Sequence, residues 1–129
     1  MSPAWLNDSV QAFGRQMGLQ EFRLQENGCA GATFENGLAL RFEYAQEALV
    51  MSMGVPLEAT DEAMKRLLVA AHPSAAAQGG PRLRVGYLSR RGEALFALRL
   101  GEREVTVTAL EAAFRMLWAA ADRLRRAAS

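Results

Sequence analysis

The sequence predicts a single α+β domain, in which a twisted antiparallel sheet is covered on one side by helices. Residues 33–53 alternate large apolar and polar side chains with a period of two, which indicates strands with one apolar face. Asn36-Gly37 between apolar runs favours a hairpin with a type I′ turn, in which both central residues have positive φ. Three other segments repeat apolar residues at helical spacing. An apolar sheet face must be covered by another element, and these helices can cover it.

The first helix is expected between Ser2-Pro3 and Gly18. Serine followed by proline is typical of a helix start, and glycine is typical of a helix end. One stripe of this helix is apolar and consists of Leu6, Val10, Phe13 and Met17.

A short strand is expected next, because Phe22 and Leu24 alternate with polar residues before the Asn27-Gly28 turn. Residues 29–34 then lead into the hairpin. The pattern leaves open whether these two segments are separate strands or one interrupted strand.

Two more strands follow the Asn36-Gly37 turn and are joined by a second turn at residues 45–47. Arg41 and Glu43 fall on the polar face of the first of them. The apolar face is predicted to contain Leu38, Leu40, Phe42, Tyr44, Leu49, Met51 and Met53.

A second helix is predicted from Thr60, a suitable N-cap, to His72-Pro73, because the residue before proline avoids the α region. Asp61 and Glu62 fall in its first turn, where they complement the helix dipole. Its apolar stripe consists of Met64, Leu67, Leu68 and Ala71.

Two further strands are expected after a connection at residues 74–81. They cover residues 82–88 and 94–100 and are joined by a loop at residues 89–93. The apolar positions of these strands are Leu83, Val85, Tyr87, Phe96, Leu98 and Leu100.

Val105 and Val107 predict one more short strand, and Thr108 and Glu111 then fit a capping box. The helix that starts there is expected to reach Arg126. Its apolar stripe consists of Leu110, Phe114, Leu117, Ala121 and Leu124.

Composition limits the possible classes of protein. The chain has 129 residues, of which 50% are hydrophobic and 22% are charged, so we expect one domain spanning 1–129 that is neither disordered nor a membrane span. One cysteine excludes an internal disulfide and fits the reducing cytoplasm. A net charge of +1 argues against partners such as nucleic acid or a membrane.

The residues that often carry chemistry are isolated in this sequence. His72, the single histidine, precedes a proline, and Cys29 has no cysteine or histidine at metal-ligand spacing. We therefore expect no metal, no cofactor and no enzyme activity, and we expect Cys29 to be a small buried residue at a strand start. Alternatives from other classes are a small enzyme using Cys29 or His72 and a module that binds a ligand in an enclosed apolar cavity. Trp5 and Trp118 lie off their helical stripes, which leaves their exposure open.

Three segments, together with the order of elements, resemble the class I type III secretion chaperones, the Tir-chaperone family. These segments cover residues 38–43, 48–56 and 110–118. The resemblance implies a cytoplasmic homodimer without enzymatic activity. Such a dimer binds the N-terminal segment of a secreted effector, keeps it soluble and secretion-competent, and presents it to the secretion apparatus. The alternative within this fold is a regulatory protein that sequesters a secretion regulator.

The resemblance also implies where the partners bind. The first helix and the early and late strands would hold the effector, and the second helix with the following strand would form the dimer. The implied effector-binding residues are Trp5, Phe13, Leu19, Phe22, Leu24, Leu95 and Ala97. The implied dimer-interface residues are Met64, Leu67, Leu68, Val85 and Tyr87.

Overall fold

The computed structural model describes residues 2–70 and 82–128. The predicted order of helix, three strands, helix, two strands and helix is confirmed. The elements are α1 (Ala4–Gln16), β1 (Cys29–Thr33), β2 (Ala39–Ala45), β3 (Ala48–Pro56), α2 (Asp61–Ala70), β4 (Arg84–Leu88), β5 (Glu93–Gly101), the 3₁₀ helix η2 (Glu102–Glu104) and α3 (Val107–Ala128).

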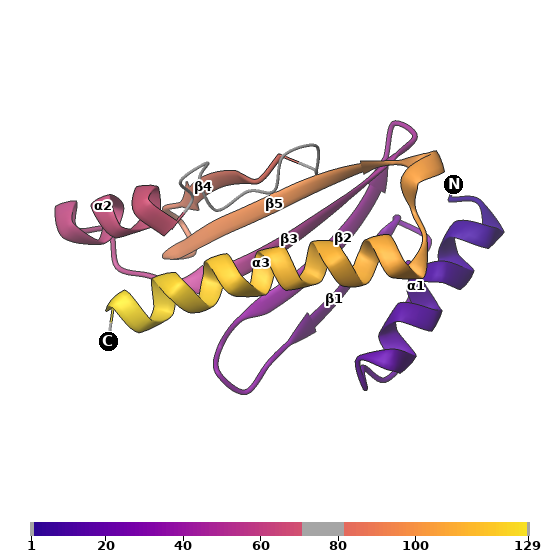
Figure 1. The fold of residues 1–129 in the computed structure, drawn as a ribbon, viewed down its shortest axis with the longest axis horizontal. Coiled ribbons are helices and arrows are strands. Elements are labelled where there is room, and N and C mark those ends of the chain that lie inside the picture. The colour runs from indigo at the N-terminus through magenta and orange to yellow at the C-terminus, as the bar shows by residue number, and fades with distance from the viewer. Residues whose placement is uncertain (1, 71–81, 129) are drawn as a thin grey trace.

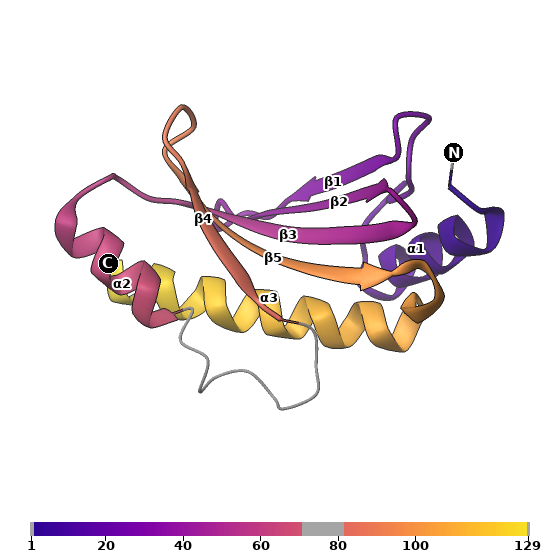
Figure 2. The ribbon, with the colours of Figure 1, turned by 90° about the horizontal axis from the view of Figure 1, so that it is seen from above.

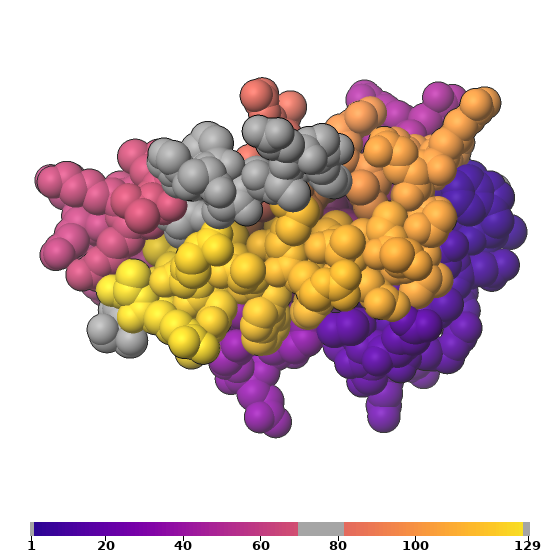
Figure 3. Space-filling model, viewed as in Figure 1, coloured from indigo at the N-terminus to yellow at the C-terminus, as the bar shows by residue number. Residues whose placement is uncertain are grey.

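The five strands form an antiparallel sheet in the order β1-β2-β3-β5-β4. The helix α3 runs across one face of this sheet, and α1 covers the same face toward β1 (Figure 1). Seen from above, the other face carries no helix (Figure 2). The space-filling view shows α3 and α1 side by side over the sheet (Figure 3). The predicted sheet with helices on one side is therefore confirmed.

Strand register decides which side chains face the helices, because directly paired residues share a face of the sheet. Phe42 pairs with Ala30 and Met51, and Met51 pairs with Leu98. These four residues are buried beneath the helices. The next row along the strands points away from the helices and consists of Gly31, Arg41, Ser52, Ala97 and Arg84.

The core between α1, α3 and the sheet contains a group of phenylalanines. The Phe13 ring centroid lies 5.4 Å from that of Phe42, 5.9 Å from that of Phe114 and 6.1 Å from that of Phe22. The predicted stripe of α3 is buried in full. Met17 is a correction to the stripe of α1, because it is 37% exposed and only Leu6, Val10 and Phe13 enter the core.

The second hairpin turn lies where it was predicted, between Ala45 and Ala48, whereas the first differs from the predicted type. At Asn36-Gly37 only Gly37 has a positive φ, of 87°. The Gly37 amide donates to the Phe34 carbonyl, so this turn is a three-residue loop rather than type I′. Positive φ at both central residues occurs instead at Gln46 and Glu47, with values of 51° and 57°.

The segment around Phe22 and Leu24 is not a strand, which corrects that prediction. Residues 22–25 have no regular secondary structure, and the first strand is Cys29–Thr33. Both apolar side chains are nevertheless buried. The Leu24 amide donates to the side-chain oxygen of Asn7 on α1, at 3.1 Å, which fixes the segment against that helix.

Thr60 is confirmed as the cap of α2, because its hydroxyl oxygen accepts from the Ala63 amide at 3.0 Å. Only part of the predicted stripe is buried. Leu67 enters the core together with Ala63, whereas Leu68 is 67% exposed. The predictions for Ala71, His72-Pro73 and residues 74–81 lie outside the described residues.

The start of α3 corrects two predictions. Val105 and Val107 form no strand, because η2 precedes Val105 and Val107 already belongs to α3. The cap is Thr106 rather than Thr108, since the Thr106 hydroxyl oxygen accepts from the Ala109 amide at 3.0 Å.

Candidate functional site: the open face of the sheet

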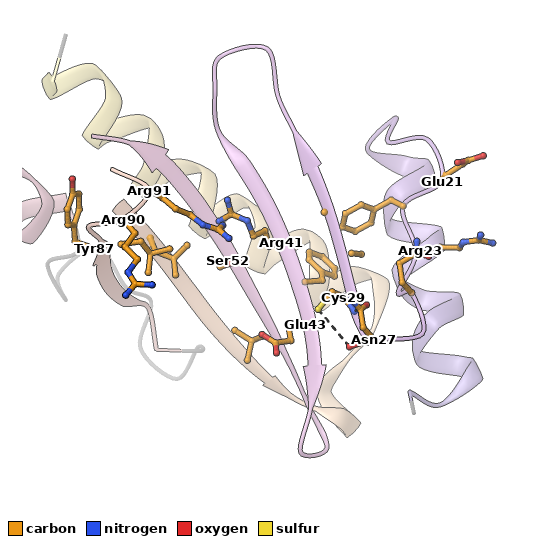
Figure 4. A pocket seen from close by; sticks show the side chains of 18 of the residues that line it. Glu21, Arg23, Asn27, Cys29, Arg41, Glu43, Ser52, Tyr87, Arg90 and Arg91 are labelled. Atoms are coloured by element: carbon orange, nitrogen blue, oxygen red, sulfur yellow. Dashed lines mark hydrogen bonds between the residues drawn. The ribbon is translucent and has the colours of Figure 1, made fainter. Parts of the chain in front are cut away.

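The face of the sheet that carries no helix contains a groove of about 930 Å³. Its walls are the segment 21–27 on one side and the β4–β5 hairpin on the other, and its floor is the outer row of the strands (Figure 4). The curvature of the sheet brings these two walls to the same side of the molecule (Figure 2).

An ion pair between Arg41 and Glu93 crosses this face. The Arg41 guanidinium nitrogens donate to the two Glu93 carboxylate oxygens at 2.8 and 3.1 Å. The pair spans β3 at Gly54, where an added Cβ would lie 2.4 Å from the Glu93 carboxyl carbon. Glycine at this position therefore leaves room for a carboxylate that would otherwise clash.

The β4–β5 hairpin supplies two exposed arginines to the groove. Arg90 and Arg91 lie in its turn, where Gly92 takes a positive φ of 59° as the sequence predicted. Arg91 extends over the strands toward Arg41 in Figure 4. Arg90 and Arg91 thus add positive charge to a groove whose other lining residues include Arg41, whose charge Glu93 compensates.

The floor of the groove is apolar around Val50 and Leu95. Leu95 is paired with Gly54 on one side and Gly86 on the other. Among the described residues, apart from Gly86 and its chain neighbours, none has an atom within 4 Å of where a Gly86 Cβ would be, so the sheet surface beside the leucine is open there. This open surface can accept an apolar side chain from an extended segment.

Cys29 lies at the opposite end of the groove and corrects the expectation of a buried residue. It is the first residue of β1, as predicted, but it is paired with Glu43 on the outer face and is only half-buried. Within the described part of the chain, no three histidine, cysteine or acidic residues are grouped to hold a metal ion.

The outer edge of β1 offers backbone groups to a partner strand. The Tyr44 amide donates to Gly28 and the Phe34 amide donates to Leu38, each at 2.8 Å. Because ladder bonds alternate along a strand, the amides and carbonyls of Gly31 and Thr33 point away from β2. Both residues are exposed, so this edge can pair with an extended chain.

The effector-binding residues implied by the resemblance fall into two groups. Leu95 lies in the groove, Ala97 lies in the adjacent outer row, and Trp5 is 47% exposed on α1. Leu19 is half-buried and lines a small pocket against Gln11 and Arg15. The other three side chains are buried in the core and offer little surface to a partner; they are Phe13, Phe22 and Leu24.

The residues implied for the dimer also differ in exposure. Leu68 and Val85 are exposed, at 67% and 37%, whereas Leu67 is buried. Met64 and Tyr87 are half-buried, and the Tyr87 hydroxyl donates to the Leu57 carbonyl at 2.8 Å.

The exposure of the two tryptophans, which the sequence left open, is resolved by the structure. Trp118 packs against Phe34 and Phe114, with ring centroids 5.3 and 5.7 Å apart. Trp5 is about half exposed, at 47%. Trp5 is therefore available for contact with a partner, whereas Trp118 is half-buried and packs against the core.

The ion pair and the role of the hairpin arginines in the groove were not predicted from the sequence. Arg41 and Glu93 are 52 positions apart, so no local pattern relates them. A signal for the arginines was present, because residues 82–99 contain five arginines and a single acidic residue, Glu93.

The model of one protein family matches most of the chain. The family is described as the type III secretory system chaperone SycN, and the match covers residues 5–124. The chain therefore belongs to this family of type III secretion chaperones, and the resemblance inferred from the sequence is confirmed. No curated protein sequence matches the chain.

Solved structures with similar folds include chains of three protein complexes. A chain of the ExsC–ExsE complex is 17% identical, with a TM-score of 0.78 over 99% of this chain and 97% of that chain. The Yersinia pestis type III secretion chaperone SycH, solved with a stable fragment of YscM2, is 16% identical, with a TM-score of 0.69 over 92% and 98%. A chain of the ExoT–SpcS complex from Pseudomonas aeruginosa is 17% identical, with a TM-score of 0.67 over 97% and 100%. At these identities the likeness establishes the fold.

None of the helices within residues 2–70 and 82–128 has the length and apolar character needed to cross a bilayer.

Proposed function

We propose that this chaperone binds the N-terminal segment of a secreted effector as an extended chain, keeps it soluble and passes it to the secretion apparatus. The observation that best supports this proposal is the groove on the face of the sheet that carries no helix. An extended segment places alternate side chains on one side, and the groove floor at Leu95, with the open surface beside it at Gly86, can receive them. The exposed edge of β1 would add backbone hydrogen bonds.

The proposal includes a cytoplasmic homodimer without catalytic activity. Leu68 and Val69 on α2 and Val85 on β4 are exposed apolar side chains, at 67%, 74% and 37%. Leu68 and Val69 are consecutive in the chain, and contiguous exposed apolar surface is typical of a protein interface. A two-fold axis would bury the same surface of both copies.

Co-purification from the native host tests the proposal. Tagged wild-type chain should recover a dominant secreted protein, identified by mass spectrometry, and Leu95→Glu should recover much less of it. Ala112→Glu is the matched control, because Ala112 is exposed on α3, on the helix-covered side. If Leu95→Glu and wild type recover equal amounts, the groove is not the binding surface. If wild type recovers no specific partner, the chaperone role itself is contradicted.

The alternative is a regulatory binder that uses the same groove for a secretion regulator. The chain shares its fold with a chain of the ExsC–ExsE complex, with a TM-score of 0.78, and the same groove can hold an extended segment of either kind of client. Deletion of the gene separates the two roles. Loss of secretion of one protein supports effector escort, whereas a change in expression of the whole secretion system supports the regulatory role.

A further inference from the structure

The β4–β5 hairpin is strongly basic. Residues 82–99 contain five arginines and one acidic residue, although the whole chain has a net charge of only +1. The single acid, Glu93, is held by Arg41 through both carboxylate oxygens. The ion pair therefore removes the one negative charge that could compensate the arginines of the hairpin.

Four of these arginines are exposed at the open face. Arg84 and Arg99 point outward by register, since Arg84 pairs with Ala97 and Arg99 pairs with Val50. Arg90 and Arg91 line the groove. Among the described residues, none of these four has an acidic partner within ion-pair distance.

Some arginines on the helices have acidic partners. Arg66 pairs with Glu62 at 3.2 Å on α2, and Arg125 pairs with Asp122 at 2.9 Å on α3. What distinguishes the open face is that four arginines without such partners occur together on two neighbouring strands and their turn. The far end of the groove is different again, since Glu21 and Glu43 line it there.

The geometry points to a client segment that is acidic where it crosses the hairpin end of the groove. This inference deepens the proposed function and rests on it. Five strands spaced about 4.8 Å apart span about 19 Å, which an extended peptide covers with about six residues. Apolar side chains at alternate positions would face the floor at Leu95 and, four register positions further along the strands, at Val50, and carboxylates near the Leu95 end would meet Arg90 and Arg91.

A protein segment fits this surface better than nucleic acid does. Single-stranded nucleic acid binds by stacking its bases on exposed aromatic rings. The aromatic residues that line the groove are Phe22 and Phe42, which are buried, and half-buried Tyr87, whose hydroxyl bonds to Leu57. The apolar floor instead suits alternating side chains.

Three labelled ten-residue peptides test the inference against the full chain. They alternate valine with aspartate, with lysine or with glutamine, and binding is followed by fluorescence anisotropy. The aspartate peptide should bind at least about tenfold more tightly than the lysine peptide at low salt, and this preference should shrink at high salt. Cys29, the one cysteine, lies in the groove, so the aspartate peptide should also slow its alkylation by iodoacetamide.

Charge reversal locates the effect. Arg90→Glu combined with Arg91→Glu should abolish the preference for aspartate, whereas Arg115→Glu should leave it intact. Arg115 is exposed on α3, away from the groove. Because all three arginines are exposed, each variant should fold, which circular dichroism verifies.

Several outcomes would overturn the inference. One is equal binding of all three peptides, and another is an equal loss of aspartate binding in the Arg115→Glu control. Tighter binding of a single-stranded DNA oligonucleotide than of the aspartate peptide would assign the arginines to nucleic acid. If wild type still recovers a secreted partner from its host, only the acidic preference fails and the proposed chaperone function stands.

Discussion

Arg41 on β2 and Glu93 on β5 form a bidentate ion pair that crosses β3. The pair passes over β3 at Gly54, where the absence of a side chain leaves room for the Glu93 carboxylate. The oxygen–nitrogen distances are 2.8 and 3.1 Å, and the side chains are 35% and 12% exposed. The pair connects β2 to β5 over β3 and occupies the face proposed for the client. The same two side chains therefore help to hold the strands together and set part of the charge on the open face of the sheet.

The first prediction concerns Gly54. Gly54→Ala should displace the Glu93 carboxylate, because the new Cβ would lie 2.4 Å from it. Breaking a partly buried ion pair should lower the free energy of unfolding by about 2 kcal/mol. Urea denaturation measures this change.

Gly86→Ala is the matched control, since nothing lies within 4 Å of the added carbon, and it should be close to neutral. In a Glu93→Ala background, the cost of Gly54→Ala should largely disappear. An undiminished cost would show that the strand, rather than the ion pair, needs the glycine.

The second prediction concerns the β2–β3 turn. Gln46 and Glu47 have φ values of 51° and 57°, a region that costs most L-residues energy. Replacing them by Asn-Gly should raise the free energy of unfolding by about 1 kcal/mol. Thermal unfolding measures the gain.

Glu35→Gly is the control for this turn, because Glu35 is not among the residues with positive φ. It should give no gain, since it adds only backbone freedom to the unfolded chain. A gain of the same size in the control would assign the effect to chain flexibility.

The third prediction concerns alkaline pH. A hydrogen bond to Glu102, together with burial and the Glu102 charge, raises the pKa of Tyr44 from 10.0 to about 12. Because the pKa is raised in the folded state, the stabilisation is complete below pH 10 and is lost as the pH rises toward 12. Tyr44→Phe should therefore weaken the loss of stability in this range.

Tyrosinate absorbance measures the shift directly in a Tyr87→Phe background, where Tyr44 is the remaining tyrosine. Glu102→Gln should move the Tyr44 pKa down toward 10, because it removes the negative charge that opposes ionisation. An unchanged titration in Glu102→Gln would show that burial and the Glu47 charge, rather than Glu102, raise the pKa of Tyr44.

The fourth prediction concerns self-association. Leu68→Glu should convert the expected dimer into a monomer, since it would bury an unpaired charge in the interface. Leu68 is 67% exposed, so the variant should keep the stability of the single chain. Analytical ultracentrifugation gives the mass.

Met17→Glu is the matched control on α1, because Met17 is also an exposed apolar residue. It should leave the mass unchanged. Leu67 is unsuitable for this test, since it is buried and its replacement would unfold the chain. A dimer that survives both Leu68→Glu and Val85→Glu would place the interface elsewhere.

Local patterns in the sequence predicted most of the core. Phe42 and Met51 follow strand alternation, and Leu110 and Leu117 follow helical spacing, so each side chain's face was fixed by its neighbours along the chain. The same patterns failed where two solutions were locally equivalent. Thr106 and Thr108 can each cap a helix, and only the path of the chain after η2 selected Thr106.

By itself, the sequence determined the order of the elements and the side of the sheet that the helices cover, because both follow from the period of its apolar residues. Tertiary structure alone decided the open face. Strand order placed Glu93 beside Gly54 and within reach of Arg41, and it left the hairpin arginines without acidic partners. Such relationships depend on residues far apart in the chain, and short-range periodicity carries no information about them.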